Sequence, residues 1–163
     1  MQVKSRRFVK EKVAKKILKI MEEQLKIKLK EDSKGKRKLE LLSSPVGEVY
    51  LIRGRPVAVR SEGDTLIPVL TYVDELPNLP RVVVDMGAVP HICNGADVMA
   101  PGISRVEGEF KKGEVVVVID EKNRRPLAIG LSLVNSEDLK NIERGKIIKN
   151  CHHVGDKLWK LLK

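Results

Sequence analysis

Residues 82–103, VVVDMGAVPHICNGADVMAPGI, combine a buried strand and a short helix within one compact stretch. The β-branched run Val82–Val84 predicts a strand, which we expect to end by Gly87. The apolar segment 88–93 is long enough for one or two helical turns. The Asn-Gly pair at 94–95 suits the left-handed backbone position that follows a helix, so the helix is expected to end there.

Three glycines punctuate this stretch, at Gly87, Gly95 and Gly102. We expect them at the end of the strand, the end of the helix and the turn that follows the extended pair Val98-Met99. A residue without Cβ lets the backbone turn sharply and lets another molecule approach closely. A single glycine explains no more than a tight turn, but three that bracket one helix predict a loop that faces a ligand.

Three short motifs carry a resemblance to a known family: DMGA at 85–88, NGADVM at 94–99 and PGI at 101–103. In this order and spacing they resemble the signature of the PUA domain, an RNA-binding module named after pseudouridine synthases and archaeosine transglycosylases. The resemblance covers Arg81 to about Gly155. It implies a PUA domain, a partly closed mixed β-barrel with two short helices. Together with the small N-terminal α+β domain that the periodicity below predicts, this makes the chain α+β.

The resemblance also implies where RNA binds. Proteins of that family grip RNA with the first helix, the glycine-rich loop after it and the last strand, which correspond to Gly87–Ile92, Gly95–Ile103 and Lys146–His152. We expect backbone amides and lysines to contact phosphates, and Met99 and Ile103 to face a terminal base. The RNA-binding residues implied are Gly87, Ala88, His91, Gly95, Ala96, Met99, Pro101, Gly102, Ile103, Lys146, Lys149 and His152.

The charge of the chain is concentrated at its N-terminal end. Of the 163 residues, the first 40 hold 15 Lys/Arg against 6 Asp/Glu, a net of +9, and the rest hold 17 against 16, a net of +1. This distribution predicts an anionic partner for the N-terminal domain. A solvated helix face rich in lysine is the alternative. The predicted basic surface consists of Arg6, Arg7, Lys12, Lys15, Lys16 and Lys19.

Two kinds of periodicity predict the N-terminal domain. An apolar period of four from Val9 to Met21, widened by Ile20 and Leu25, predicts a helix over Arg7–Leu25 whose stripe packs on its own domain. From Leu25 the period becomes two, which predicts a hairpin of 25–29 with 38–41 around a basic tip. We expect a second strand pair at 48–52 and 56–60, and a strand or short helix at 66–73.

The segment DELPNLP at 74–80 predicts a domain boundary, because two nearby prolines disfavour helix and remove backbone donors. The predicted domains are residues 1–76, the PUA domain at 81–155 and a C-terminal helical turn at 156–163 packed on it.

The second domain is predicted to be mostly strand. The continuous apolar run within Glu114–Asp120 indicates a strand covered on both faces, and Leu127–Val134 is its expected antiparallel partner. Ser136 is the expected N-cap of a short helix that reaches Glu143. Lys146–His153 is the expected last strand, and Asp156 is expected to cap a final turn.

Catalytic and metal chemistry are not favoured. No phosphate-binding glycine-lysine loop or dinucleotide fingerprint is present in the sequence. Zinc would require His91 and Cys93 of the first helix to meet Cys151, His152 and His153 of the last strand. Since His152 and His153 are expected on opposite faces of that strand, no metal or cofactor is predicted. Asp85 and Asp97 are expected to cap turns, and residues 1–76 leave no room for a catalytic domain, so an enzyme is not predicted. Two isolated cysteines, no signal peptide and no long apolar run predict a cytoplasmic protein without membrane association.

A closer resemblance rests on the pairing of a small basic domain with a C-terminal PUA domain, and in the N-terminal half it is found mainly around Ile67 to Pro80. Residues 84–88, 95–102 and the tail 136–159 resemble archaeal relatives of the malignant T-cell amplified sequence protein and the N-terminal half of ligatin. This implies an RNA-binding protein of translation that holds the 3′ CCA end of tRNA, with its basic domain on the RNA of the small ribosomal subunit. A partner protein with an initiation-factor-one-like domain is also implied.

Two other functions remain open. In the first, the protein would be an accessory that delivers tRNA or rRNA to a separate modifying enzyme. In the second, it would be an adaptor whose basic N-terminal helix docks an acidic protein. Co-sedimentation with ribosomes distinguishes the first alternative from a role in translation, and RNA affinity beyond that of any protein of this charge distinguishes the second.

Overall fold

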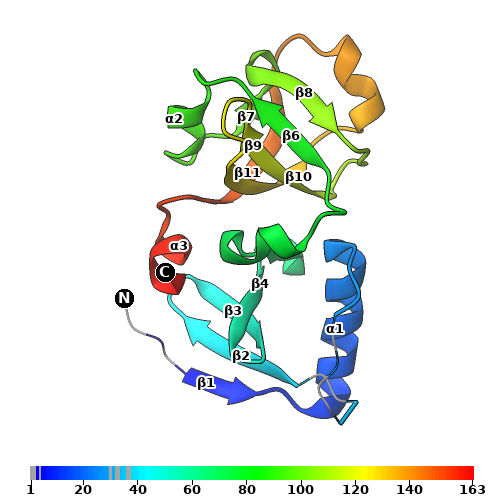
Figure 1. The fold of residues 1–163 in the computed structure, drawn as a ribbon, viewed down its shortest axis with the longest axis vertical. Helices are drawn as coiled ribbons and strands as arrows, with labels where there is room; N and C mark the ends of the chain where they lie inside the picture. The colour runs from blue at the N-terminus through cyan, green and yellow to red at the C-terminus, as the bar shows by residue number, and fades with distance from the viewer. Residues whose placement is uncertain (1–2, 4, 30, 32–33, 36–37) are drawn as a thin grey trace. The chain divides into compact units, whose positions relative to one another are not determined.

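The computed structural model describes residues 3, 5–29, 31, 34–35 and 38–163, and Figure 1 shows its helices and strands. The chain divides into two compact units between Asn78 and Leu79, within the proline-rich segment. At the C-terminal end, residue 162 groups with the first unit and residue 163 with the second. Each unit is described by itself below.

The first unit contains an antiparallel five-stranded sheet and the helix α1 (Glu11–Leu25). The strands follow chain order across the sheet: β1 (Ser5–Phe8), β2 (Leu39–Ser44), β3 (Gly47–Ile52), β4 (Arg55–Arg60) and β5 (Leu66–Pro68). The side-chain Oε1 of Gln24 accepts a hydrogen bond from the backbone N–H of Leu66 at 2.9 Å, which fastens α1 to β5. A short 3-10 helix, Leu70–Glu75, closes the unit.

The predicted helix Arg7–Leu25 is wrong at its start, because Ser5–Phe8 forms the edge strand β1. Pairing with β2 gives these backbone groups partners that a helix end would leave unsatisfied. The stripe that packs inward agrees with the prediction at Met21 and Leu25, but nearer the start of the helix it lies one residue along, on Ala14 and Leu18.

The predicted hairpin of 25–29 with 38–41 does not form. Lys26 has the left-handed conformation φ 55°, ψ 42° and ends α1, and the residues after it form no strand as far as Leu29. The N–H of Leu29 instead donates to Glu22 Oε2 at 2.8 Å. β2 takes its neighbours from β1 and β3, and the expected basic tip lies partly outside the described residues.

Other predictions for the first unit hold. The second strand pair is confirmed as β3 and β4, which turn through Arg53 and Gly54 at φ 54° and 76°. Glycine tolerates that left-handed backbone without cost, which is why the turn falls at this place. The segment 66–73 is confirmed as both expected elements, strand β5 followed by the 3-10 helix.

The second unit is a six-stranded mixed sheet in the order β7-β11-β10-β9-β6-β8. Only the β6–β9 pair is parallel among the described strands. The elements are β6 (Arg81–Val84), α2 (Val89–Ile92), β7 (Val98–Met99), a 3-10 turn (Ala100–Gly102), β8 (Ile103–Glu107), β9 (Val115–Asp120), β10 (Pro126–Ser132), a 3-10 helix (Ser136–Asn141), β11 (Lys146–His153) and α3 (Lys157–Leu162). The predicted α+β class, with its mixed, curled sheet and short helices, is confirmed.

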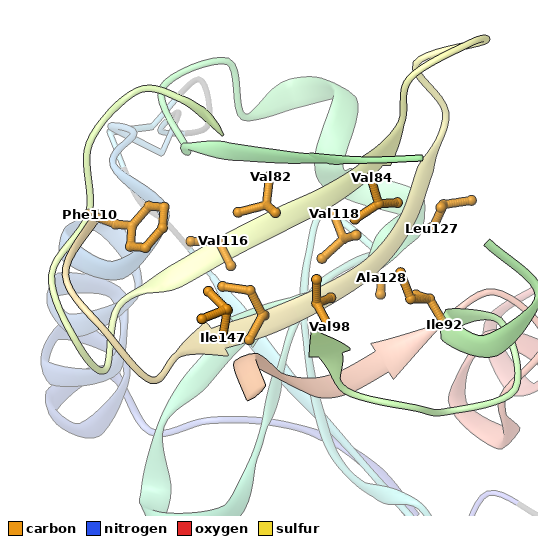
Figure 2. Close-up of a cluster of buried hydrophobic side chains, with 11 residues drawn as sticks. Val82, Val84, Ile92, Val98, Phe110, Val116, Val118, Leu127, Ala128 and Ile147 are labelled. Carbon is orange, nitrogen blue, oxygen red and sulfur yellow. The ribbon is translucent and has the colours of Figure 1, made fainter. Parts of the chain in front are cut away.

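Alternating valines of β6 and β9 fill the inside of this curled sheet. Figure 2 shows Phe110 at one end of the cluster and Ile92 with Leu127 at the other. All six residues of β9 are buried, as a strand covered on both faces requires. The core therefore ends at α2, which places that helix at the rim of the sheet.

Three details of the second unit bear on the sequence analysis. The strand β8 was not predicted, because its first residue was assigned to the glycine loop. Ser136 is not the N-cap: Asn135 precedes the 3-10 helix, and Ser136 Oγ accepts a hydrogen bond from the Phe110 N–H at 3.0 Å. The Asp156 cap is confirmed, since its Oδ1 accepts from the Trp159 N–H at 2.7 Å.

Candidate nucleic-acid interface

A hollow of about 440 Å³ opens on the second unit between α2, the loop after it and the 3-10 turn that precedes β8. Six of the predicted RNA-binding residues line it: Ala88, His91, Ala96, Met99, Pro101 and Gly102. Ile92 and Val98 form the rest of its apolar wall, and Asp85 and Asp97 contribute carboxylates. Elements that are separate in the sequence thus form one concave surface of a kind that takes a small organic group.

The turn after β6 forms one wall of the hollow. Asp85 Oδ1 accepts a hydrogen bond from the Ala88 N–H at 2.9 Å, and the Asp85 N–H donates to the Gly102 carbonyl at 2.9 Å. A Cβ on Gly102 would lie 3.1 Å from the Ala88 Cβ, closer than ordinary contact. The predicted turn-capping role of Asp85 is confirmed, and glycine at 102 lets the two segments of the wall approach each other.

Asn150 of β11 holds the opposite wall. Its Nδ2 donates to the carbonyls of Ile92 and Ala96, both at 3.0 Å, and its backbone N–H donates to Asp97 Oδ1 at 2.9 Å. One side chain therefore satisfies the end of α2 and the loop after it. The sequence analysis missed this residue. The signal that could have pointed to it is an asparagine, with its side-chain amide, inside the predicted last strand.

Replacing Asn150 by alanine should loosen this wall, because two carbonyls at the end of α2 lose their donor. We expect a loss of about 1 kcal/mol in the free energy of unfolding. Amide hydrogen exchange of residues 88–97 should become faster. Asn141→Ala, an exposed asparagine of the same unit, is the control. Unchanged exchange in residues 88–97 would contradict the role assigned to Asn150.

An ion pair joins the wall of the hollow to its rim. Asp97 Oδ2 lies 3.3 Å from Lys146 Nζ, and the Lys146 side chain is 64% exposed. In the β7–β11 pair, Lys146 is opposite Met99, which is itself 44% exposed and lines the hollow. Carboxylates thus lie at the wall and an ammonium group at the rim, beside an apolar surface.

Gly95 lies where the left-handed residue after the helix was expected, with φ 95°. A Cβ added there would lie 3.4 Å from Nε2 of His153. Since His153 Nδ1 donates to the Val154 carbonyl at 2.9 Å, Nε2 of the neutral ring is the acceptor nitrogen. His153, which the sequence analysis did not select, therefore lies beside the glycine loop.

His152 differs from the expectation that it reaches RNA. The side chain is 1% exposed, and its Nδ1 lies 2.8 Å from Asp156 Oδ2. Burial alone would raise the pKa of Asp156, but hydrogen bonds from His152 and from the N–H groups of Trp159 and His153 hold that pKa below its ordinary value. His152 fastens the end of β11 to the cap of α3, and we leave it out of the interface.

The remaining predicted contacts lie outside the lining of the hollow. Ile103 packs partly against the core at the start of β8, Lys149 is exposed on β11, and Gly87 is exposed in the turn after β6.

Burial raises the pKa of the Cys93 thiol. Within the described residues, no group of three or more His, Cys, Asp or Glu side chains is placed to hold a metal ion. Among the same residues, no helix is long and apolar enough to cross a membrane.

The predicted basic surface lies on the first unit. Arg6 pairs with Glu40, with Nε 2.7 Å from Oε2, whereas Arg7 is exposed on β1. The four lysines are all exposed along α1: Lys12, Lys15, Lys16 and Lys19.

Comparison with known proteins adds four similarities. Residues 80–154 match the PUA domain family, within the range that the motifs indicated. A Methanocaldococcus jannaschii protein is 38% identical over 160 residues, 98% of each chain. Translation machinery-associated protein 20 of Saccharomyces cerevisiae is 34% identical over 69% of this chain and 65% of its own length. Malignant T-cell-amplified sequence 1 of Danio rerio is 27% identical over 69% of this chain and 64% of its own.

The fold is also found among solved structures. A PUA domain structure from Aeropyrum pernix, determined as a tartrate complex, matches with a TM-score of 0.83 at 26% identity, over 97% of this chain and 90% of that one. The predicted resemblance is confirmed by these matches. The chain spans less than two thirds of the yeast and zebrafish proteins.

Proposed function

We propose that this chain binds RNA in translation. It belongs to the family of PUA-domain proteins that includes the Methanocaldococcus jannaschii relative. The finer proposal is that the hollow beside α2 receives the 3′ CCA end of tRNA. The observation that carries it is the convergence of six predicted contacts on one concave surface. Similarity to a protein named for association with the translation machinery supports the cellular setting.

The chemistry of the hollow decides how RNA would lie in it. Asp85 repels phosphates from the wall, and Lys146 at the rim is 64% exposed although it pairs with Asp97, so the sugar-phosphate chain belongs at the rim. A base or ribose fits inside, because Met99 and Pro101 offer apolar surface and carboxylate oxygens accept from amino and hydroxyl groups. A free chain end reaches such a hollow more readily than a paired strand, since its last nucleotide is unstacked.

The test is a fluorescence-anisotropy titration of labelled tRNA with and without its 3′ CCA, over a salt series. Each phosphate contact should add about −0.7 to −0.9 to the slope of log affinity against log salt. Tighter binding of the CCA-bearing tRNA at high salt is the expected result. Equal binding of the two tRNAs, lost together as salt rises, would reject the terminal-nucleotide site.

A pair of variants locates the contact. Met99→Ser removes apolar surface from the hollow, and we expect it to reduce the preference for CCA-bearing tRNA by about tenfold, because burying a methionine side chain is worth about 1.5 kcal/mol or more. Leu133→Ser is the matched control, because Leu133 is an exposed apolar residue of the same unit that does not line the hollow. Equal preferences in the two variants would place the binding site elsewhere.

The first unit is proposed to bind ribosomal RNA of the small subunit. Its exposed lysines offer contacts to phosphates, and these features support a role in binding without catalysis. Sedimentation with purified small subunits, with and without a partner that carries an initiation-factor-one-like domain, tests this part. Failure to co-sediment under either condition would reject it while leaving the tRNA result unaffected.

A further inference from the structure

The side chains of the helix α1 fall into three rows, each displaced by one residue, and so by about 100° around the helix, from the next. The buried row, which packs on the unit's own sheet, is Ala14, Leu18, Met21 and Leu25. The exposed apolar row consists of Val13 and Ile20, which are exposed, and the half-buried Ile17 between them. The basic row is Lys12, Lys16 and Lys19. Spacings of three and four residues place each set along one face of the helix, so the rows run side by side.

The exposed apolar row is larger than the fold of the first unit requires. Val13 is 47% exposed and Ile20 is 45% exposed. Phe8, at the end of β1 and close to the start of α1 in sequence, is 62% exposed. Of the seven exposed large hydrophobic side chains in the described residues, four lie between Val3 and Ile20, so exposed apolar surface is concentrated at this end of the first unit.

The basic row is available to a partner. Its three lysines are exposed, and no carboxylate of the described part of the chain forms an ion pair with any of them. Arg6 differs from these lysines, because it is paired with Glu40 on the adjacent strand β2.

We propose that the exposed apolar row and the basic row together form a docking site for an acidic amphipathic helix of a partner protein. Aliphatic side chains of such a helix would pack on Val13, Ile17 and Ile20, and its Asp or Glu residues would face the lysines. Charge complementarity sets the orientation of the partner helix about its own axis, because the lysines lie on one side of the exposed apolar row and the unit's own sheet lies on the other.

Two other anionic partners fit the rows less well. RNA would bind the lysines, as proposed above for ribosomal RNA, but its phosphates gain nothing from a row of valine and isoleucine, so RNA and the acidic helix would compete for the basic row alone. An anionic membrane would use both rows, yet helices that lie in the interface commit a broad apolar face containing large side chains such as Trp, Phe and Leu. Most of the apolar face of α1 is already buried. The exposed apolar row that remains is one side chain wide, which suits packing against a single helix.

The probe is a synthetic acidic peptide with leucine at positions i, i+4 and i+7 and glutamate beside each, labelled for anisotropy and titrated into the whole chain. We expect Val13→Ser/Ile20→Ser to weaken peptide binding by about tenfold or more, since two anchors of a short seam are lost. The matched control is Met86→Ser/Leu133→Ser, which removes two exposed apolar side chains of the second unit at 40% and 36% exposure. Circular dichroism melting checks that both variants fold.

Further arms separate apolar docking from charge alone. A scrambled peptide of the same composition should bind more weakly than the designed peptide. The triple variant Lys12→Gln/Lys16→Gln/Lys19→Gln should bind the designed peptide more weakly, and this binding should depend less on salt. Equal binding of both peptides, or of the designed peptide to the serine variant, overturns the proposal. Phosphatidylserine vesicles that bind through Val13 and Ile20 while the peptide does not would also overturn it. The preference for CCA-bearing tRNA should be unchanged in the serine variant, so this test fails or succeeds separately from the tRNA proposal.

Discussion

Replacing Gly130 by alanine is expected to destabilise the second unit by about 3 kcal/mol or more. A Cβ at this position of β10 would lie 2.3 Å from Ile148 Cγ2 and 2.5 Å from the Lys149 carbonyl oxygen. Both atoms belong to β11, the neighbouring strand, and Ile148 is fully buried in the core. Neither the backbone carbonyl nor the packed methyl group has room to retreat, so the two strands must separate.

The position of Gly130 explains the requirement. The β10–β11 register shifts between Ile129 and Gly130, which brings the two backbones unusually close at this point. Gly87→Ala is the matched control: its new Cβ would lie 3.4 Å from Asp85 Oδ1, an ordinary contact, and its backbone is not left-handed. Urea unfolding, with hydrogen exchange of β10 and β11 as the readout for this unit, measures the difference. Equal stability of the two variants would show that the strands can separate at little cost.

Replacing Asp120 by alanine is expected to cost about 2 kcal/mol of stability in the same unit. Asp120 ends β9, is 3% exposed, and accepts backbone N–H donors from the β9–β10 turn. Lys122 donates at 3.0 Å to one carboxylate oxygen, Arg125 at 3.0 Å to the other, and Asn123 also donates. Without the carboxylate these donors must find water, and the turn loses its internal support.

This carboxylate also predicts a dependence on pH. The N–H of Asn123, and then those of Arg125 and Lys122, hold the pKa of Asp120 below its ordinary value, although burial opposes them. A depressed folded-state pKa contributes stability above the unfolded pKa, about 3.9, and that stability is lost as the pH falls through the folded pKa.

The stability gap between wild type and Asp120→Asn should therefore be widest near neutral pH and should close in acid. Urea unfolding across this pH range measures the gap. Asp138→Ala, an exposed carboxylate of the same unit, is the control and should show little gap at any pH. A gap for Asp120→Asn that stays constant down to acid pH would show that charge is not what the turn requires.

Local patterns were sufficient for much of the second unit. The β-branched runs at 82–84 and 115–119 predicted β6 and β9, because a strand covered on both faces has no polar positions to obscure it. The glycines and the 94–95 pair predicted the turns around α2, and the motifs at 85–103 indicated the family. These signals lie within a few residues of one another, so no tertiary contact was needed to recognise them.

The prediction failed where a distant segment competes with a local preference. Residues 5–8 continue the polar and apolar pattern of the helix, but β2 offers an open strand edge, and backbone pairing with it takes precedence. The period of two after Leu25 predicted a strand, yet no neighbour pairs with it as far as Leu29. His152 and His153 differ by one position on β11, and only the fold shows that the first is buried against Asp156 and the second lies beside Gly95.

Composition and spacing within short segments were enough to predict the class of fold, the glycine-bracketed loop and the basic N-terminal helix. Contacts in the folded chain were needed to find that Asn150 holds the end of α2, that Gly130 must lack a side chain, and that α1 keeps a second apolar row exposed. Those features arise from contacts between strands and helices far apart in the chain, and no pattern of neighbouring residues records which atoms will meet there.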